Sequence, residues 1–146
     1  MRLTMGLTAL VAACLVMFAG PGLAATGSAT VKTRHGKLGT YLVDGKGRTL
    51  YLFEKDRTKK STCTDACATA WPPLTTKGRP KAAGAAKASL LGTSKRADGT
   101  TQVTYRGHPL YYFVQDKKAG DTKGQNVDGF GAEWYVVSPA GKKIDR

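Results

Sequence analysis

Hydrophobic residues occur along this chain in short runs that are separated by glycine-containing turns. Short apolar runs bounded by turn residues are typical of β-strands rather than of long helices. Strands are predicted over residues 30–34, 40–44, 49–55, 101–105, 109–115 and 133–138, with a further short strand over 142–145. The pattern predicts one helix, over residues 61–71, which Pro72 and Pro73 end.

The chain contains an internal repeat. Residues 39–56 align without gaps to residues 99–116, and eight of the eighteen positions are identical. The identical pairs are Gly39/Gly99, Thr40/Thr100, Val43/Val103, Gly47/Gly107, Leu50/Leu110, Tyr51/Tyr111, Phe53/Phe113 and Asp56/Asp116. Trp71 and Trp134 keep nearly the same spacing. A tandem duplication of this kind predicts a mainly β fold, in which two pseudo-symmetric β-meander repeats pack as one domain with one short helix.

The third predicted strand carries apolar side chains on both of its faces. Tyr51 and Phe53 fall on one face, and Leu50 and Leu52 fall on the other. Because successive side chains of a strand point to opposite sides, this pattern indicates a strand that is buried on both sides. The corresponding strand of the second repeat has the same division, so the two strands are expected to form the core.

The repeats define the expected domain organisation. Residues 1–24 are predicted to be a signal peptide, and residues 25–146 a single domain. Its repeats cover about 29–74 and 89–139, and a basic Ala/Gly-rich connector, 75–88, joins them. A connector of this composition is expected to be mobile.

The first residues have the composition of an export signal. Arg2 precedes a 13-residue apolar stretch over 7–19, and a proline-glycine pair and small residues follow it. Cleavage is predicted after Ala24 or Ala25, so the protein is expected to be secreted or extracytoplasmic. An uncleaved membrane anchor is one alternative. Lipidation of Cys14 is another, which the apolar residues after Cys14 disfavour.

The chain is strongly basic, with 23 lysines and arginines, ten acidic residues and a formal charge of +13. Such a charge attracts anionic partners. Because the chain is expected to be exported, anionic cell-envelope polymers or lipid headgroups are predicted as partners, and nucleic acid is not. The alternative is that the charge serves solubility alone, since the basic residues are spread through loops. The hydrophobic content of 41% is enough for a folded core.

The segments YLFEKD at 51–56 and YYFVQD at 111–116 both fit the pattern Tyr-x-(Phe/Trp/Tyr)-x-x-Asp. They are accompanied by GRTL at 47–50, CTDAC at 63–67, WPPL at 71–74, GHPL at 107–110 and WYVVSP at 134–139. With these segments the chain resembles the bacterial family of secreted repeats, or predicted lipoproteins, that carries this motif. The resemblance covers essentially the whole mature chain. It implies an extracytoplasmic repeat protein, and it implies no established activity.

The repeated motif residues are the candidates for a ligand site. They are Tyr51, Phe53, Asp56, Tyr111, Phe113 and Asp116. Two carboxylates beside two tyrosines could form a symmetric ligand or cation site at the pseudo-dyad. An aspartate at the end of a strand also caps the following turn by accepting backbone N–H bonds. The repeated aspartates are expected to act mainly as such caps.

Cys63 and Cys67 are predicted to form a structural disulfide. On a helix, positions four residues apart have Cα atoms about 6 Å apart, and an exported protein folds in an oxidising compartment. Closing so small a loop contributes about 2 kcal/mol. A redox pair or a metal site are the alternatives, and His108 is a weak candidate for a metal ligand. Arg48 occupies the matching position of the first repeat, so the imidazole is not repeated.

Together these features predict a non-catalytic secreted or cell-envelope repeat protein, a binding or scaffold module whose ligand is unknown. No cofactor is expected. The sequence has neither a nucleophile elbow nor a glycine-rich phosphate loop in its expected setting. The alternative function is an accessory role in metal, haem or electron-transfer chemistry in the envelope, and an enzyme is the least favoured class.

Overall fold

The computed structural model describes residues 27–146. The predicted signal peptide, its cleavage site and Cys14 lie outside the described residues. The elements are β1 (Thr30–Gly36), β2 (Gly39–Asp44), β3 (Tyr51–Phe53), α1 (Ala66–Ala70), β4 (Lys81–Ala82), the 3-10 helix η1 (Ala88–Leu90), β5 (Leu91–Lys95), β6 (Thr101–Tyr105), β7 (His108–Pro109), β8 (Val127–Gly129) and β9 (Ala132–Val136).

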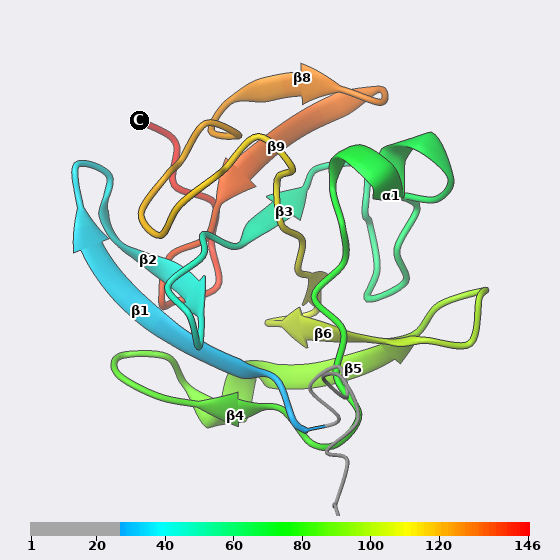
Figure 1. The fold of residues 1–146 in the computed structure, drawn as a ribbon, viewed down its shortest axis with the longest axis horizontal. Helices are drawn as coiled ribbons and strands as arrows, with labels where there is room; N and C mark the ends of the chain where they lie inside the picture. Colours follow the sequence, from blue (N-terminus) through cyan, green and yellow to red (C-terminus); the bar gives the residue numbers. More distant parts are fainter. Residues whose placement is uncertain (1–26) are drawn as a thin grey trace, which may run out of the picture.

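The strands form three small sheets, with the orders β2-β1-β4, β3-β9-β8 and β5-β6-β7. In Figure 1 the β8–β9 hairpin and α1 lie at one end of the molecule and β5 and β6 at the other, with β1 and β2 along one side. The hairpin β1–β2 of the first repeat corresponds to β5–β6 of the second. Gly39 and Gly99 occupy matching places in the two hairpins, with φ of +88° and +86°, which glycine adopts without strain. The predicted fold class, mainly β with two pseudo-symmetric repeats and one short helix, is confirmed.

The last strand of the second repeat pairs with the first repeat. β9 runs antiparallel to β3, and Phe53 stands opposite Trp134. The Glu54 N–H continues this pairing by donating to the Glu133 carbonyl at 3.0 Å. Residues that are far apart in sequence therefore form one continuous ladder.

In the same way, the last segment of the first repeat pairs with the second repeat. Residues 70–74 run antiparallel to residues 110–114, and the Val114 N–H donates to the Ala70 carbonyl at 3.0 Å. Pro72 and Pro73 have no N–H, so they interrupt this ladder. Of the strand predicted over 109–115, only Pro109 lies in a strand, β7, and Tyr111 forms isolated bridges to Tyr51 and Pro73. The two repeats are interlocked by exchanged segments.

Two hydrophobic clusters meet at β3. Tyr51 and Phe53 belong to an aromatic cluster, and Leu50 and Leu52 belong to an aliphatic one. All four side chains are at most 3% exposed. The prediction of a strand buried on both sides is confirmed, although β3 is shorter than expected, because the chain turns where the Asp56 N–H donates to the Phe53 carbonyl at 3.0 Å.

The connector 75–88, which its composition predicted to be mobile, is held against the edge of β1. β4 pairs in parallel with β1, and the Lys81 and Ala83 N–H groups donate to the carbonyls of Ala29 at 2.8 Å and Val31 at 2.9 Å. These bonds satisfy backbone groups that an open β1 edge would leave unpaired.

Besides β4, the apolar pattern predicts neither β5, which pairs with β6, nor β8 and the 3-10 helix η1. The helix is limited to α1, because Asp65, at the position before it, has a φ of +54° outside the helical region. The strand predicted over 142–145 is a single bridge between Val137 and Lys143. Within residues 27–146, no helix has the length and hydropathy needed to cross a bilayer.

Candidate functional site

The six motif residues meet where the two repeats cross. The Tyr51 N–H donates to the Tyr111 carbonyl at 2.8 Å, and the Tyr111 N–H donates back to the Tyr51 carbonyl at 3.0 Å. This reciprocal pair is the centre of the pseudo-dyad. Both tyrosines are fully buried, so the backbone places their rings in the interior.

Each motif tyrosine is bonded to the motif aspartate of the other repeat. The Tyr51 hydroxyl donates to Asp116 Oδ2 at 2.6 Å, and the Tyr111 hydroxyl donates to Asp56 Oδ2 at 2.6 Å. The tyrosine and aspartate of one motif therefore do not bond each other, and each bonds its partner in the other repeat. Nothing in either segment alone indicates this crosswise pairing, because the partners lie 65 and 55 residues apart.

The second oxygen of each aspartate holds the loop that follows its own strand. Asp56 Oδ1 accepts the Thr62 N–H at 2.7 Å, and Asp116 Oδ1 accepts the Lys123 N–H at 2.9 Å. Both aspartates are buried. Each carboxylate thus joins a loop of its own repeat to a tyrosine of the other.

The electrostatics of the crossing keep the phenols protonated. Burial raises the pKa of Tyr51 well above its ordinary value, and the hydrogen bond to Asp116 raises it further. Burial and the charge of Asp56 do the same to the pKa of Tyr111. Burial also raises the pKa of Asp116, while its bonds from Tyr51 and the Lys123 N–H oppose that shift. The phenols act as permanent donors to the carboxylates.

Four aromatic rings stack across the same crossing. Phe53 stacks on Trp134 with ring centroids 4.0 Å apart, Trp134 on Trp71 at 3.9 Å, and Trp71 on Phe113 at 4.1 Å. Each tryptophan thus contacts the phenylalanine of the other repeat. Tyr51 and Tyr111 meet the tryptophans edge to face. This order of rings results from the backbone pairing, which places the tryptophan segment of each repeat beside the aromatic segment of the other.

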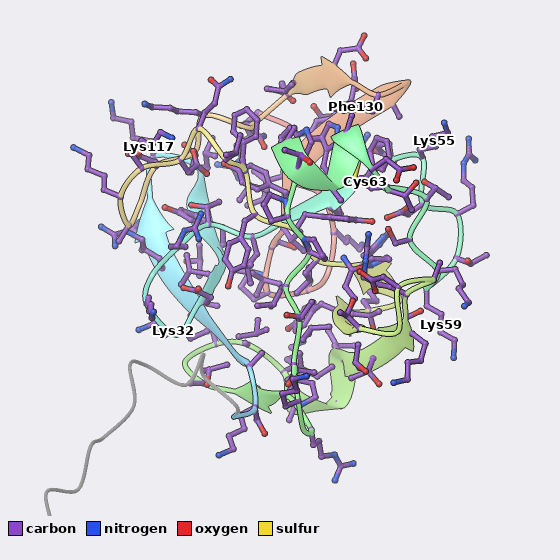
Figure 2. The ribbon with its side chains drawn as sticks, turned by 45° about the vertical axis from the view of Figure 1, so that its right-hand side comes forward. Lys32, Lys55, Lys59, Cys63, Lys117 and Phe130 are labelled. Atoms are coloured by element: carbon purple, nitrogen blue, oxygen red, sulfur yellow. A yellow bond between two sulfur atoms is a disulfide. The ribbon has the colours of Figure 1, made fainter. Side chains whose placement is uncertain are left out.

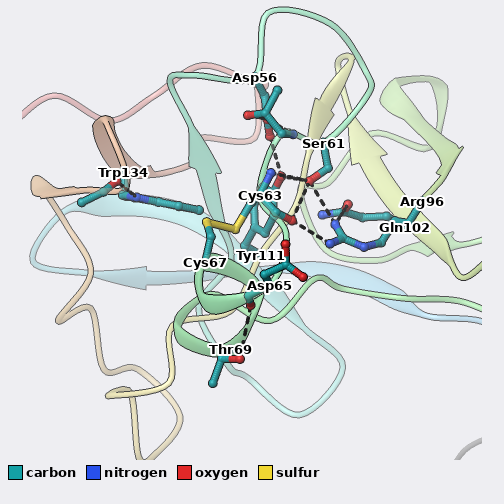
Figure 3. The surroundings of a disulfide bond; sticks show 12 residues. Asp56, Ser61, Cys63, Asp65, Cys67, Thr69, Arg96, Gln102, Tyr111 and Trp134 are labelled. Atoms are coloured by element: carbon teal, nitrogen blue, oxygen red, sulfur yellow. Dashed lines mark hydrogen bonds between the residues drawn. A yellow bond between two sulfur atoms is a disulfide. The ribbon is translucent and has the colours of Figure 1, made fainter. Parts of the chain in front are cut away.

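The disulfide lies beside this crossing (Figure 3). Cys63 and Cys67 are bonded, as predicted, with Cα atoms 5.2 Å apart, and both are buried. Arg96 at the end of β5 donates to the Cys63 carbonyl at 2.7 Å and to Ser61 Oγ at 3.0 Å. Ser61 Oγ is in turn 2.6 Å from the Tyr111 hydroxyl. The disulfide loop is therefore tied to the second repeat through side chains.

His108 lies half-buried in an open cleft of about 590 Å³. The cleft is also lined by Leu52, Glu54, Arg106, Gly141, Lys142, Lys143 and Asp145. Burial lowers the pKa of His108, Arg106 lowers it further, and Glu54 and Asp56 oppose the shift. Among residues 27–146, no group of three or more histidine, cysteine or acidic side chains is arranged to hold a metal ion.

We expect His108 to make the protein less stable in mild acid. Because its pKa in the folded state lies below the ordinary value of 6.5, the unfolded chain binds the proton more readily. The stability contributed by the neutral imidazole is complete above about pH 6.5 and is lost as the pH falls through the lower, folded-state pKa. Urea denaturation at pH 7.5 and pH 5 should show a smaller loss for His108→Gln than for the wild type. An equal loss in both proteins would contradict this assignment.

Few charged side chains of the described residues pair with an opposite charge. The described residues hold 22 lysines and arginines and all ten acidic residues. Within residues 27–146 there is a single ion pair, Lys143 with Glu54 at 2.8 Å. Five aspartates accept backbone N–H bonds in turns and loops instead: Asp44, Asp56, Asp98, Asp116 and Asp121. In Figure 2 the labelled lysines project outward from different parts of the molecule.

A family model described as a secreted repeat of unknown function matches residues 32–75 and 92–138, which together make up more than half of the chain. The two matches coincide with the two structural repeats and stop at the connector. No curated protein and no solved structure matches the chain.

Proposed function

Because the chain belongs to the family of secreted repeats of unknown function, we propose that it acts outside the cytoplasm as a non-catalytic module that binds anionic polymers of the cell envelope. The disulfide between Cys63 and Cys67 supports a place in an oxidising compartment. The proposal names one class of ligand for a family whose activity is not established.

The unpaired positive charge of the surface carries the proposal. Within the described part of the chain, all but one of the lysines and arginines lack a carboxylate partner. With 22 lysines and arginines against ten acidic residues, residues 27–146 also carry a large net positive charge, which produces a positive field around the protein. Such a field attracts polyanions over a distance and strengthens their binding at low ionic strength.

The motif residues in the interior are already fully engaged, which favours ligand binding by exposed side chains. The motif aspartates and tyrosines already bond one another at 2.6 Å, and the motif phenylalanines stack on the tryptophans. A ligand at the crossing would have to displace these contacts and enter a packed aromatic core. Exposed side chains are therefore the better candidates for binding.

Binding to a poly(glycerol phosphate) chain of defined length tests the proposal. We expect association at 0.15 M NaCl that weakens steadily as the salt concentration rises, measured by titration calorimetry at several salt concentrations. Anionic phospholipid vesicles provide the comparison with lipid headgroups. Absence of binding to the polymer at 0.05 M NaCl, or binding to vesicles alone, would overturn the proposal.

A further inference from the structure

We propose that a groove between the connector and the β5–β6 hairpin binds the phosphate groups of a linear anionic polymer. This inference rests on the proposed function and assigns it to one site. The groove holds about 760 Å³. Lys77, Arg79 and Lys81 of the connector line it on one side, with Thr93 and Thr101 of the hairpin on the other.

The groove is basic and contains no opposing charge. No aspartate or glutamate is among its lining residues. Lys77, Arg79 and Lys81 are exposed, and within residues 27–146 none of the three side chains forms an ion pair or donates a hydrogen bond. Three unpaired cations at alternate positions of one segment thus face the same hollow.

The hollow continues beyond this segment, which favours a polymer over a small anion. A second groove of about 360 Å³ shares Thr76, Lys77 and Thr101 with the first and adds Lys95 and Thr100. It also contains no acidic side chain. The two adjoining grooves together offer Lys77, Arg79, Lys81 and Lys95, so that several cations are available to a chain with repeated negative charges.

The floor of the groove is fixed by hydrogen bonds. The Thr76 hydroxyl donates to the Gly78 carbonyl at 2.7 Å and accepts the Ala29 N–H at 2.9 Å. The Thr76 N–H donates to the Thr101 carbonyl at 3.0 Å. With β4 paired to β1 as well, the backbone that carries the cations is ordered before a ligand arrives. Ordering in advance lowers the entropic cost of binding.

The side chains suit phosphate oxygens. Arginine forms two parallel hydrogen bonds to a phosphate, lysine adds a compact charge, and threonine hydroxyls are neutral donors. Binding then replaces the mobile counterions of the polymer by fixed cations, so each contact adds to the salt dependence of affinity.

The chain offers a matched control for this site. Lys55, Arg57 and Lys59 are also exposed and have the same residue types at the same spacing, and they line neither groove. Figure 2 places Lys55 and Lys59 at the outside of the molecule. Neutralising either triplet to glutamine removes three positive charges, so the two variants differ only in where the charge is lost.

We expect the groove variant Lys77→Gln/Arg79→Gln/Lys81→Gln to bind poly(glycerol phosphate) at least about tenfold more weakly than the wild type at 0.15 M NaCl. Its plot of log affinity against log salt should be less steep by about two to three. The control variant Lys55→Gln/Arg57→Gln/Lys59→Gln should lose less than about threefold. Thermal unfolding of both variants checks that exposed substitutions leave the fold unchanged.

The possible failures are distinguishable. Equal losses in the two variants would overturn the groove and leave a diffuse polyanion-binding surface, which is the proposed function without a site. No binding by the wild type would overturn the proposed function itself. Tighter, groove-dependent binding of polygalacturonate than of poly(glycerol phosphate) would overturn the assignment to phosphate, because the groove would then select carboxylates.

Discussion

Replacing Trp134 by alanine is expected to lower the free energy of unfolding by about 3–5 kcal/mol. The side chain is fully buried between Phe53 and Trp71, with ring centroids 4.0 and 3.9 Å away. Its removal opens a cavity in the middle of the four-ring stack, and both neighbouring rings belong to the first repeat whereas Trp134 belongs to the second. Urea denaturation followed by circular dichroism measures the loss.

Phe130→Ala is the matched control for this prediction. Phe130 precedes Gly131 in the same β8–β9 hairpin but is 46% exposed, so its loss should change stability by less than about 1 kcal/mol. If Trp134→Ala lowers the free energy of unfolding no more than Phe130→Ala does, the aromatic stack does not stabilise the contact between the two repeats. Near-ultraviolet circular dichroism should also lose the signal of the stacked tryptophan pair in Trp134→Ala alone.

The second large effect is expected from the motif aspartates. Asp116→Ala should lower the free energy of unfolding by about 2–4 kcal/mol, because it leaves the buried Tyr51 phenol and the Lys123 N–H without an acceptor. Asp56→Ala should lower it by a smaller amount, because the Thr62 N–H loses its acceptor but the Tyr111 phenol can still donate to Ser61 Oγ. Asp128→Ala, in which the lost carboxylate is exposed, should be nearly neutral. Chemical denaturation of the three variants measures the differences, and polymer binding by Asp56→Ala and Asp116→Ala should remain intact.

A double-mutant cycle tests the crosswise pairing itself. Tyr51→Phe combined with Asp116→Ala should show a coupling energy of about 1–3 kcal/mol, since these side chains bond each other directly. Tyr51→Phe combined with Asp56→Ala should be closer to additive, although Tyr51 and Asp56 belong to the same motif. A larger coupling within one motif than between motifs would contradict the pairing.

The crossing explains the spacing of tyrosine and aspartate in the repeated motif of this chain. The tyrosine must lie on β3, or on its counterpart, with its ring toward the aromatic cluster. The aspartate must follow the turn that the Asp56 and Asp116 N–H groups close on Phe53 and Phe113, both at 3.0 Å. That turn presents the carboxylate to the tyrosine of the other repeat. The motif is therefore completed only when two copies meet.

The strands could be predicted in large part because their causes are local. Short apolar runs bounded by turn residues placed β1, β2, β6 and β9 within a few residues, and the two apolar faces of residues 50–53 predicted burial on both sides. The disulfide between Cys63 and Cys67 could be predicted from their short separation and the expected export, although Cys63 lies before α1 and not on the helix predicted over 61–71.

Long-range pairing could not be predicted in the same way. Composition suggested a free connector, whereas β4 joins the edge of β1 because that edge has unpaired backbone groups. The basic groove was also missed, since its cations come from the connector and its hydroxyls from the β5–β6 hairpin. Residues that are distant in sequence form these features, and no periodicity within either segment encodes the contact.

The sequence by itself determined that this protein is a basic, duplicated β-unit, because repetition, short apolar runs and charge are properties of the chain. Only the tertiary structure decided that the motif residues of one copy complete those of the other. Both motif aspartates could cap their own loops in an isolated repeat, but a carboxylate has a second oxygen, and burial makes an unpaired oxygen costly. The exchange of segments brings each of these oxygens a buried tyrosine hydroxyl.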